Sequence, residues 1–353
     1  MKKLLARNKR VIIKYLESFL RQKSRQYAGV HPRWSRDVMT RLLEYTKRGK
    51  MVRGGLIMLT CEMFGKKADK EVIKTAAAIE LFHSALLVHD DIMDRSDLRR
   101  SKASMHLQYE KIGQQENFTE PAHFGQSSAL CVGDVVFLIT FELLSSLKIK
   151  PQQKEKIITT FAQEMASVGL AQLGEMYLGY SRKKVQKKEI MKVYRFKTAR
   201  YTISLPLIMG ALLADQNKKT MRLIERIGEY IGIMFQIRDD ELGLFGQEEG
   251  VGKSVGVDIQ ENKKTLYYYY LYKKSSPAQK RKLNKVFGKK KISASELKYI
   301  QTLVRELGVD KDILQEIGKL KKKTLGMFYG LKTKNRYKIA LRELMEFIVQ
   351  RKK

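Results

Sequence analysis

Apolar residues recur every three or four positions through most of the chain, which is the period of an α-helix. This pattern predicts helices over 69–92, 127–147, 153–180, 187–214, 218–245 and 293–306. The basic, amphipathic segment 2–21 predicts one more helix at the N-terminus. The most β-prone patch, Tyr267 to Tyr270, is flanked by helical patterns and is ambiguous. The expected fold class is all-α.

Prolines and polar stretches predict where the helices end. Pro32, Pro121 and Pro151 lie in polar stretches where a helix should begin or stop. Loops are expected around 111–126, 181–186 and 246–257, and a solvated boundary between helix and loop in the Lys-rich segment 278–292. Because no repeat or interdomain linker is evident, we expect a single domain over 1–353. It has a motif-bearing core of about 40–275 and Lys-rich C-terminal helices over 276–353.

Composition narrows the class of protein. The 353 residues include 70 Lys and Arg against 37 Asp and Glu, a net charge of +33, with 43% hydrophobic residues. The chain is too apolar to be disordered, and we expect charges to interrupt any membrane span or signal peptide. A cytoplasmic globular protein follows. No nucleic-acid motif is present, so no nucleic-acid partner is expected. Peripheral contact with a membrane surface, through the basic N-terminal helix, stays open.

The two cysteines, Cys61 and Cys131, lie in apolar runs. This predicts buried thiols in a reducing compartment. Two cysteines also exclude a disulfide framework and a cysteine-based zinc site.

Two acidic clusters end strongly apolar helical segments, one over 89–94 and one over 236–241. In a helix, Asp90 and Asp94 point the same way, about 5.4 Å apart along the axis. Such oxygen-rich clusters suit Mg²⁺, which binds through one or two carboxylates plus substrate phosphates. Solvated helix ends are the alternative for either cluster alone.

Cationic residues follow each cluster. Arg99 and Arg100 come after the first, and Lys253 and Lys263 come after the second. The helix before the first cluster places His83 on the same face as Asp90. Together these residues predict a site that holds a diphosphate between metal ions and basic side chains.

The order of these motifs resembles the trans-isoprenyl diphosphate synthase (polyprenyl synthetase) family over residues 40 to 275. Segment 48–54 resembles its GGKRxRP segment, 80–94 its first aspartate-rich motif, 99–100 its arginine pair, 194–199 its KT segment and 235–240 its second aspartate-rich motif. The chain has Gly243 where many members have a third aspartate, and Glu175 where the family's GQxxD stretch has aspartate.

The resemblance implies an isoprenoid synthase fold, a helical bundle around a deep central cavity. It also implies a homodimer, and the apolar segment 127–144 is the candidate interface, with ordinary core as the equal alternative. The implied activity is a magnesium-dependent prenyltransferase that joins isopentenyl diphosphate head to tail to an allylic diphosphate (dimethylallyl, geranyl or farnesyl diphosphate).

The site residues follow from the same resemblance. The implied ligands of three Mg²⁺ ions are Asp90, Asp91, Asp94, Asp239 and Asp240. The implied allylic diphosphate site is Arg99, Lys197, Lys253 and Lys263, and the implied isopentenyl diphosphate site is Lys50, Arg53, His83 and Arg100. Thr198 and Gln236 would place oxygen dipoles near the carbocation, and Gln172 and Glu175 would lie outside the first ring of ligands. We expect the catalytic set to be Asp90, Asp94, Lys197, Thr198, Gln236 and Asp239.

Residues upstream of Asp90 bear on product length. Ala85 and Leu86 lie one helical turn before it, and Phe82 lies two turns before it. An aromatic at the second turn favours a C20 product, geranylgeranyl diphosphate, over C15, with C25 or longer open. Alternatively, Phe82 is plain core.

Two other classes stay open. A class I terpene cyclase is disfavoured, because the second cluster lacks the Ser/Thr and Glu of its usual metal triad. A non-catalytic partner subunit would have lost aspartates or cations, and the main ones are present.

Overall fold

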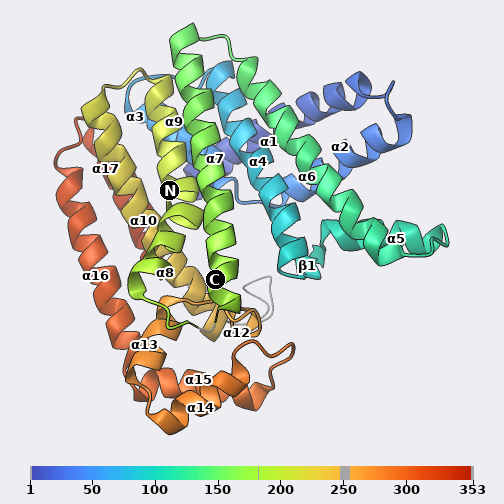
Figure 1. The fold of residues 1–353 in the computed structure, drawn as a ribbon. Helices are drawn as coiled ribbons and strands as arrows, with labels where there is room; N and C mark the ends of the chain where they lie inside the picture. The colour runs from blue at the N-terminus through green and yellow to red at the C-terminus, as the bar shows by residue number, and fades with distance from the viewer. Residues whose placement is uncertain (1, 182, 247–254, 351–353) are drawn as a thin grey trace. The chain divides into compact units, whose positions relative to one another are not determined.

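The computed structural model describes residues 2–181, 183–246 and 255–350, which are almost entirely helical (Figure 1). Within these residues the strands are β1 (Leu98–Arg99) and β2 (Lys102–Ala103), so the all-α class is confirmed. The chain divides into two compact units. Unit 1 is Met1–Thr160 with Pro206–Asn217, and unit 2 is Phe161–Leu205 with Lys218–Lys353. The single domain stays a prediction.

Unit 1 is built around helix α4, which packs against α3 and α6 (Figure 1). Three alanines of α4, Ala76, Ala77 and Ala78, are fully buried and let neighbouring helices approach. A Cβ on Gly54 of α3 would lie 2.9 Å from the Ala76 carbonyl oxygen, so only glycine fits there. The helices of unit 1 are α1 (Lys2–Gln26), α2 (Pro32–Lys47), α3 (Val52–Met63), α4 (Lys70–Met93), α5 (Met105–Gln115), α6 (Pro121–Ser145), the first residues of α7 (Pro151–Tyr180) and most of α9 (Leu205–Leu213).

The predicted N-terminal helix is confirmed, and it extends to Gln26. Its apolar face packs on α2, α3 and α4, where Ile12, Leu16 and Leu20 are buried. The amphipathic pattern of this segment is therefore explained by the core. Ile12 on this face is completely covered, so it is not available for contact with a membrane surface.

Unit 2 is built around helix α10 and the π-helix η1, which pack along each other. Gly228 and Gly232 of α10 make this approach possible, because a Cβ on either would lie 2.5 or 2.4 Å from a Cα atom of η1. Gln236 and Asp240 continue the same face at four-residue spacing. The elements of unit 2 are the rest of α7, α8 (Lys187–Val193), η1 (Tyr194–Ser204), α10 (Lys218–Phe245), α12 (Val257–Gln260), α13 (Leu266–Lys274), α14 (Pro277–Val286), α15 (Ala294–Glu306), α16 (Val309–Phe328) and α17 (Asn335–Val349).

Most element predictions are confirmed, and the length of one loop is corrected. Pro32, Pro121 and Pro151 each begin a helix, as expected. The loop expected over 111–126 is present but shorter, residues 116–120, because α5 continues to Gln115 and α6 begins at Pro121. The Lys-rich segment 278–292 contains the end of helix α14 at Val286 and the loop that follows, as expected, and the ambiguous patch Tyr267–Tyr270 lies in helix α13. Most of the loop predicted over 246–257 lies outside the described residues.

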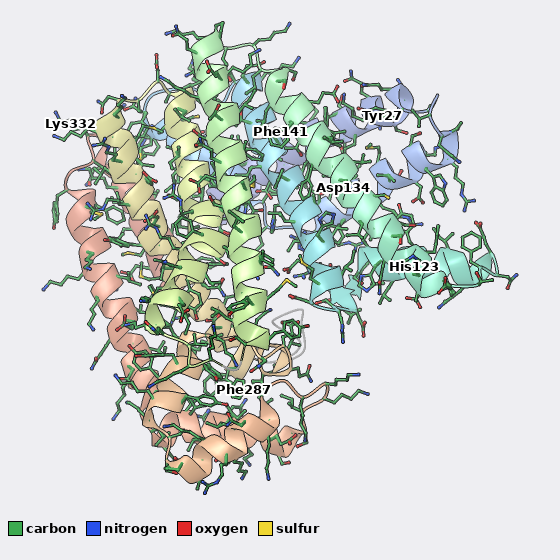
Figure 2. All side chains as sticks on the ribbon, viewed as in Figure 1. Tyr27, His123, Asp134, Phe141, Phe287 and Lys332 are labelled. Carbon is green, nitrogen blue, oxygen red and sulfur yellow. The ribbon has the colours of Figure 1, made fainter. Side chains whose placement is uncertain are left out.

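Helix α6 is less buried than helix α4. It shows Asp134 to solvent, whereas Phe141 on the same helix is half-buried (Figure 2). Cys131 is also exposed, so the prediction of two buried thiols is wrong for this residue and right for Cys61. By length and composition, α4 and α6 could each cross a membrane, contrary to our expectation that charges interrupt every such run. Most of the apolar window of α4 is buried inside the structure, as in a core helix.

Candidate active site

The first acidic cluster lies at the C-terminal end of α4, in unit 1. Asp94 caps the helix, and its amide donates to the Asp90 carbonyl at 2.8 Å. Both side chains are half-buried, and their four-residue spacing puts them on one face. The Nη2 atom of Arg99 lies 3.6 Å from Oδ2 of Asp90. The last turn of α4 therefore presents two carboxylates beside one guanidinium.

Asp91 is oriented differently from Asp90 and is completely buried. Its carboxylate accepts hydrogen bonds from the Tyr45 hydroxyl at 2.9 Å and from Nε of Arg99 at 2.8 Å, and it also pairs with Nη2 of Arg99. Burial raises the pKa of Asp91, and the hydrogen bonds and charge of Arg99 oppose this shift. Asp91, which we expected to bind metal, has both oxygens engaged by protein groups and holds Arg99 in place.

A tight hairpin fixes the two arginines that follow. Strands β1 and β2 pair Leu98 with Ala103, and the turn residues Arg100 and Ser101 both have left-handed backbones, with φ of 52° and 60°. Such turns favour glycine and asparagine, so this backbone is strained. The strain is balanced by contacts: Nη1 of Arg100 donates to the Tyr45 carbonyl at 3.0 Å. A Cβ atom on Gly49 would lie only 3.0 Å from Nη1 of Arg100.

Three of the four residues predicted to bind isopentenyl diphosphate lie close enough to interact. Burial lowers the pKa of His83 well below its usual range, and the charges of Arg53 and Arg100 add to the effect. Glu80 of α4 is buried against the start of α3, where its Oε1 accepts a hydrogen bond from the Gly54 amide at 2.7 Å. Burial raises the pKa of Glu80, and the charge of Arg53 opposes this. A neutral imidazole between guanidinium groups is suited to an anionic ligand. The fourth residue, Lys50, is exposed between α2 and α3.

In unit 2, η1 carries the predicted residues Lys197 and Thr198. The Thr198 hydroxyl donates to Oε1 of Gln236 at 2.6 Å. The Lys197 ammonium pairs with Glu175, the residue that replaces an aspartate of the family pattern. The longer side chain of Glu175 therefore reaches and orients Lys197. π-Helical turns such as η1 occur frequently at functional sites.

The second acidic cluster also has one exposed and one buried aspartate. Asp239 is exposed, whereas Asp240 is buried and accepts from the Tyr194 hydroxyl and, at 2.7 Å, from Nε2 of Gln236. The Tyr194 hydroxyl in turn accepts from the Leu266 amide at 2.9 Å. Burial, and then the charge of Asp258, raise the pKa of Asp240 well above its usual range. Asp240, also expected to bind metal, is held by neutral groups.

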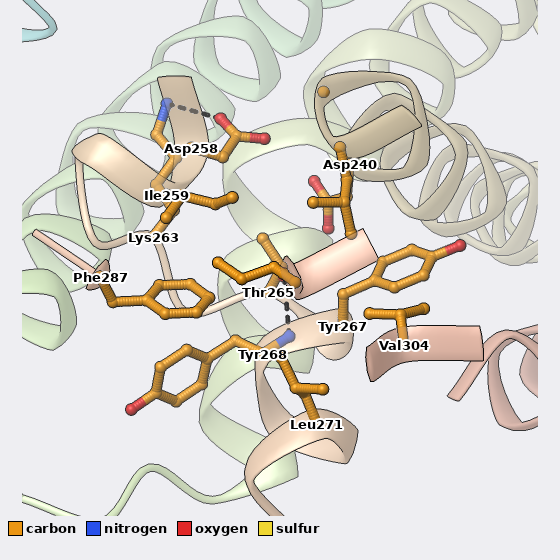
Figure 3. Close-up of a pocket in the computed structure, with 13 residues that line it drawn as sticks. Asp240, Asp258, Ile259, Lys263, Thr265, Tyr267, Tyr268, Leu271, Phe287 and Val304 are labelled. Carbon is orange, nitrogen blue, oxygen red and sulfur yellow. Dashed lines mark hydrogen bonds and ion pairs between the residues drawn. The ribbon is translucent and has the colours of Figure 1, made fainter. Parts of the chain in front are cut away.

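Lys263 lies in a small polar group beside α12 (Figure 3). Its Nζ is 3.5 Å from Oδ1 of Asp258 and 2.5 Å from Oε2 of Glu261. Lys253, the other lysine predicted for the allylic diphosphate, lies outside the described residues.

Our reading of the sequence missed the residues that support the site. Tyr45 and Tyr194 hold the buried aspartates, and Glu80 holds the start of α3. Arg200 anchors η1, because it bonds Glu164 and pairs with Glu225 and Glu229. A signal was available for the glycines: Gly228 and Gly232 stand at four-residue spacing in line with Gln236.

The acidic side chains of both units are suited to an open magnesium site. Over the described residues, no group of three or more His, Cys, Asp or Glu side chains forms a closed metal site. Mg²⁺ is commonly held by one or two carboxylates plus substrate phosphates and water. The open pair Asp90 and Asp94, and the exposed Asp239, fit that pattern.

The chain is similar to known isoprenyl diphosphate synthases. The chain is 31% identical to the short chain isoprenyl diphosphate synthase of Methanocaldococcus jannaschii, over 71% of this chain and 70% of the relative. It is 29% identical to the geranylgeranyl diphosphate synthase of Sulfolobus acidocaldarius, over 75% of this chain and 76% of the relative.

A solved structure extends the likeness to nearly the whole chain. The geranylgeranyl pyrophosphate synthase from Corynebacterium glutamicum, complexed with isoprenyl diphosphate and magnesium, has a TM-score of 0.91 and 27% identity, and 98% of this chain and 99% of that chain are covered. The fold is that of the isoprenyl diphosphate synthases. The model of the polyprenyl synthetase family matches residues 34–304, and the chain belongs to that family. It is a prenyltransferase of the short-chain type.

Proposed function

We propose that this chain condenses isopentenyl diphosphate head to tail with an allylic diphosphate and releases geranylgeranyl diphosphate, the C20 product. The observation that carries this proposal is the last turn of α4, where Asp90 and Asp94 share a face beside Arg99. A diphosphate leaving group needs charge stabilisation that is in place before the C–O bond breaks.

The residues of unit 1 have distinct tasks in this proposal. Arg53, His83 and Arg100, with the exposed Lys50, bind isopentenyl diphosphate through protein groups and without metal, so that this substrate is not activated to ionise. Arg99, oriented by Asp91, contacts the allylic diphosphate. Bidentate guanidinium groups suit phosphate oxygens.

The residues of unit 2 have their own tasks in this proposal. Lys197, oriented by Glu175, neutralises part of the diphosphate charge, with Lys253 and Lys263. The oxygens of Thr198 and Gln236 stabilise positive charge on the hydrocarbon. No side-chain base is required, because the departing diphosphate accepts the proton after condensation.

Asp90 and Asp94 would hold two magnesium ions, and Asp239 would hold a third. When bound, the ions supply the positive charge that the leaving diphosphate needs. We assign Asp91 and Asp240 to the support of this set, because each is buried and hydrogen-bonded to a tyrosine.

The test is incubation with isopentenyl diphosphate and each allylic diphosphate (C5, C10 and C15), with and without Mg²⁺, followed by chromatography of the products. We expect a C20 product that depends on magnesium. A cyclic hydrocarbon would indicate a terpene cyclase instead. No product with any primer would reject the proposal and would favour a non-catalytic partner subunit.

The product length has its own test at Phe82. Its ring is buried and packs 4.5 Å from Phe137 and 6.3 Å from Phe141, centroid to centroid. We propose that Phe82 limits chain growth, whereas Ala85 and Leu86 leave room for it. Phe82→Ala should lengthen the product, and Phe137→Leu serves as a control that keeps Phe82 in place. An unchanged product in Phe82→Ala would assign Phe82 to the core.

The proposal includes a homodimer in the cytoplasm. It is supported by the apolar stripe that α6 exposes, Leu130, Val135 and Leu138, of which Leu138 is 71% exposed. Both cysteines are free thiols, as suits a reducing compartment. Leu138→Glu should convert a dimer into a monomer in analytical ultracentrifugation, and a wild-type monomer would contradict the proposed dimer.

A further inference from the structure

The basic excess of the chain is concentrated in one segment of unit 2. Residues 262–295 contain eleven lysines and arginines and no aspartate or glutamate. This segment therefore carries one third of the net charge of +33. It comprises α13, α14, the loops around them and the first two residues of α15.

Helix α14 turns its basic residues outward. Its apolar residues Leu283 and Val286 are buried. Phe287, just after the helix, packs 5.2 Å from Tyr268 and 5.9 Å from Tyr272, centroid to centroid. The opposite face and the following loop carry six cationic residues, exposed except for the half-buried first one, and we name them the α14 patch: Lys280, Arg281, Lys282, Lys285, Lys290 and Lys291.

The neighbouring helices hold α14 in place. The Tyr272 hydroxyl of α13 donates to Oδ1 of Asn284 at 2.9 Å. On the other side, Nζ of Lys282 lies 3.6 Å from the ring centroid of Tyr299 on α15, which runs beside α14 (Figure 1). A capping box at Ser276 fixes the start of α14. The charges are therefore presented by a folded element.

Carboxylates do not neutralise the α14 patch. Nearby lysines outside it are paired: Lys289 lies 2.6 Å from Glu296, and Lys274 pairs with Asp312. Within the described residues, no member of the patch forms such an ion pair. Six like charges thus lie close together and repel one another, and an anionic surface would balance them.

The form of the patch favours an extended anionic surface. The charges lie on one helix face and the loop after it, which suits a flat partner better than a small enclosed ligand. A membrane that contains anionic phospholipids attracts clusters of about four to eight lysines and arginines by charge alone. A single nucleic-acid strand would also require aromatic rings for base stacking. The rings beside α14 pack on one another instead.

We propose that the α14 patch binds the surface of a membrane that contains anionic phospholipids, peripherally and reversibly. Because α14 buries its apolar residues, binding depends on charge and involves no insertion into the hydrocarbon. The inference goes beyond the proposed function and does not depend on it. The proposed product gives the contact a use, since a C20 diphosphate is an amphiphile that enters such a membrane.

Co-sedimentation of the full chain with lipid vesicles tests the proposal. Vesicles of phosphatidylcholine alone are compared with vesicles that also contain about 30% phosphatidylglycerol, at low and at high salt. At low salt the wild type should partition onto the anionic vesicles at least about tenfold more strongly than onto the neutral ones. High salt should remove this difference, because it screens exposed charges.

A patch variant removes four of the six charges. It combines Arg281→Gln, Lys285→Gln, Lys290→Gln and Lys291→Gln. Its partition onto the anionic vesicles should fall at least about tenfold at low salt. Its Tm should match that of the wild type, because all four side chains are exposed. If this variant does not fold, the double variant Lys290→Gln/Lys291→Gln, confined to the loop, still decides.

A control variant removes the same amount of charge elsewhere in unit 2. It combines four exposed positions: Lys311→Gln, Lys322→Gln, Lys332→Gln and Lys334→Gln. Its partition onto the anionic vesicles should stay within about threefold of the wild type, since the attraction falls off within about a Debye length of the membrane.

Three results would overturn the inference. The first is a wild type that does not prefer anionic vesicles at low salt. The second is an equal loss in the patch variant and the control variant, which would assign the attraction to the net charge of the whole chain. The third is tighter binding of the patch to a random-sequence oligonucleotide than to the vesicles. A wild type that forms no product with any primer would reject the proposed function and would leave the vesicle result unchanged.

Discussion

The two acidic clusters share a plan. Each begins with a pair of adjacent aspartates on a long helix, Asp90–Asp91 in unit 1 and Asp239–Asp240 in unit 2. In each pair, the first side chain has access to solvent and the second is buried. Each buried carboxylate accepts a hydrogen bond from a tyrosine hydroxyl. The same dipeptide therefore provides one candidate metal ligand and one anchor in both units.

The two anchors differ in charge balance. Asp91 pairs with the guanidinium of Arg99, whereas Asp240 is held by the neutral groups of Tyr194 and Gln236. A buried ion pair that loses one partner leaves an uncompensated charge, whereas a buried carboxylate among neutral donors is itself destabilising when ionised. The same Asp-Asp dipeptide therefore holds a charge-paired anchor in unit 1 and an anchor among neutral donors in unit 2.

The largest effect is expected at the first aspartate of each pair. Asp90→Asn and Asp239→Asn should each lower kcat/KM by about 10³-fold, because several kcal/mol of leaving-group stabilisation depend on the bound cations. The Tm measured without magnesium should stay within about 2 °C of the wild type, since both side chains reach solvent. A large loss of Tm would show that these residues are structural, and unchanged kinetics would remove them from the site.

Replacing the second aspartate of each pair should lower the free energy of unfolding by different amounts. Asp91→Asn leaves Arg99 buried without its counter-charge and should lower the free energy of unfolding by about 3–5 kcal/mol. Asp240→Asn removes a destabilised charge and keeps part of the hydrogen bonding, so it should change stability by about 1–2 kcal/mol. Urea unfolding followed by circular dichroism measures both, and equal losses would contradict the difference that we draw between the anchors.

For the two tyrosines, the larger loss of stability is expected in unit 2 and not in unit 1. Tyr194→Phe removes the donor to Asp240 and leaves the buried Leu266 amide without its acceptor, so it should lower stability by about 2–3 kcal/mol. Tyr45→Phe should cost about 1 kcal/mol, because Arg99 still holds Asp91. Thermal unfolding of the two variants side by side gives the comparison, and a larger loss for Tyr45→Phe would overturn it.

The smallest effect concerns acid. Folding lowers the pKa of His83 below its unfolded value of about 6.5. Below that pH the unfolded chain gains a proton that the folded protein does not accept, so His83 reduces stability as the pH falls. At pH 5.5 this amounts to about 1 kcal/mol.

The variant His83→Gln should therefore lose less Tm between pH 7.5 and pH 5.5 than the wild type. All five histidines of the chain precede residue 161, so this acid sensitivity belongs to unit 1. An identical pH dependence in the variant would exclude His83 as a source. The exposed His123, changed to glutamine, is the control.

The fold class and the motif residues could be predicted from sequence because they depend on local patterns. Helix α4 is evident from its apolar period, and the spacing of Asp90 and Asp94 places them together without any tertiary knowledge. Pro121 correctly predicted a boundary, but the short polar stretch before it concealed the last turns of α5. That segment carries both Gln and Gly, which occur in loops as well as at helix ends.

The supporting residues could not be predicted because their partners are distant in sequence. Tyr45 and Asp91 are 46 positions apart, as are Tyr194 and Asp240. Nothing local distinguishes these tyrosines from the others, and nothing local distinguishes a buried aspartate from its exposed neighbour. The left-handed turn at Arg100 is also invisible to propensity, since arginine rarely adopts that backbone.

Helix α10 has one further consequence, which follows from its four-residue repeat of Gly228, Gly232, Gln236 and Asp240. Two glycines that allow the close approach of η1, and two polar side chains that bond to it, lie on one face of α10. All four positions must therefore face η1. Deleting a single residue between Gly232 and Gln236 would rotate the two polar positions by about 100° about the helix axis relative to the two glycines. A deletion at this point of α10 should therefore be far more damaging than a substitution at an exposed position of the same helix.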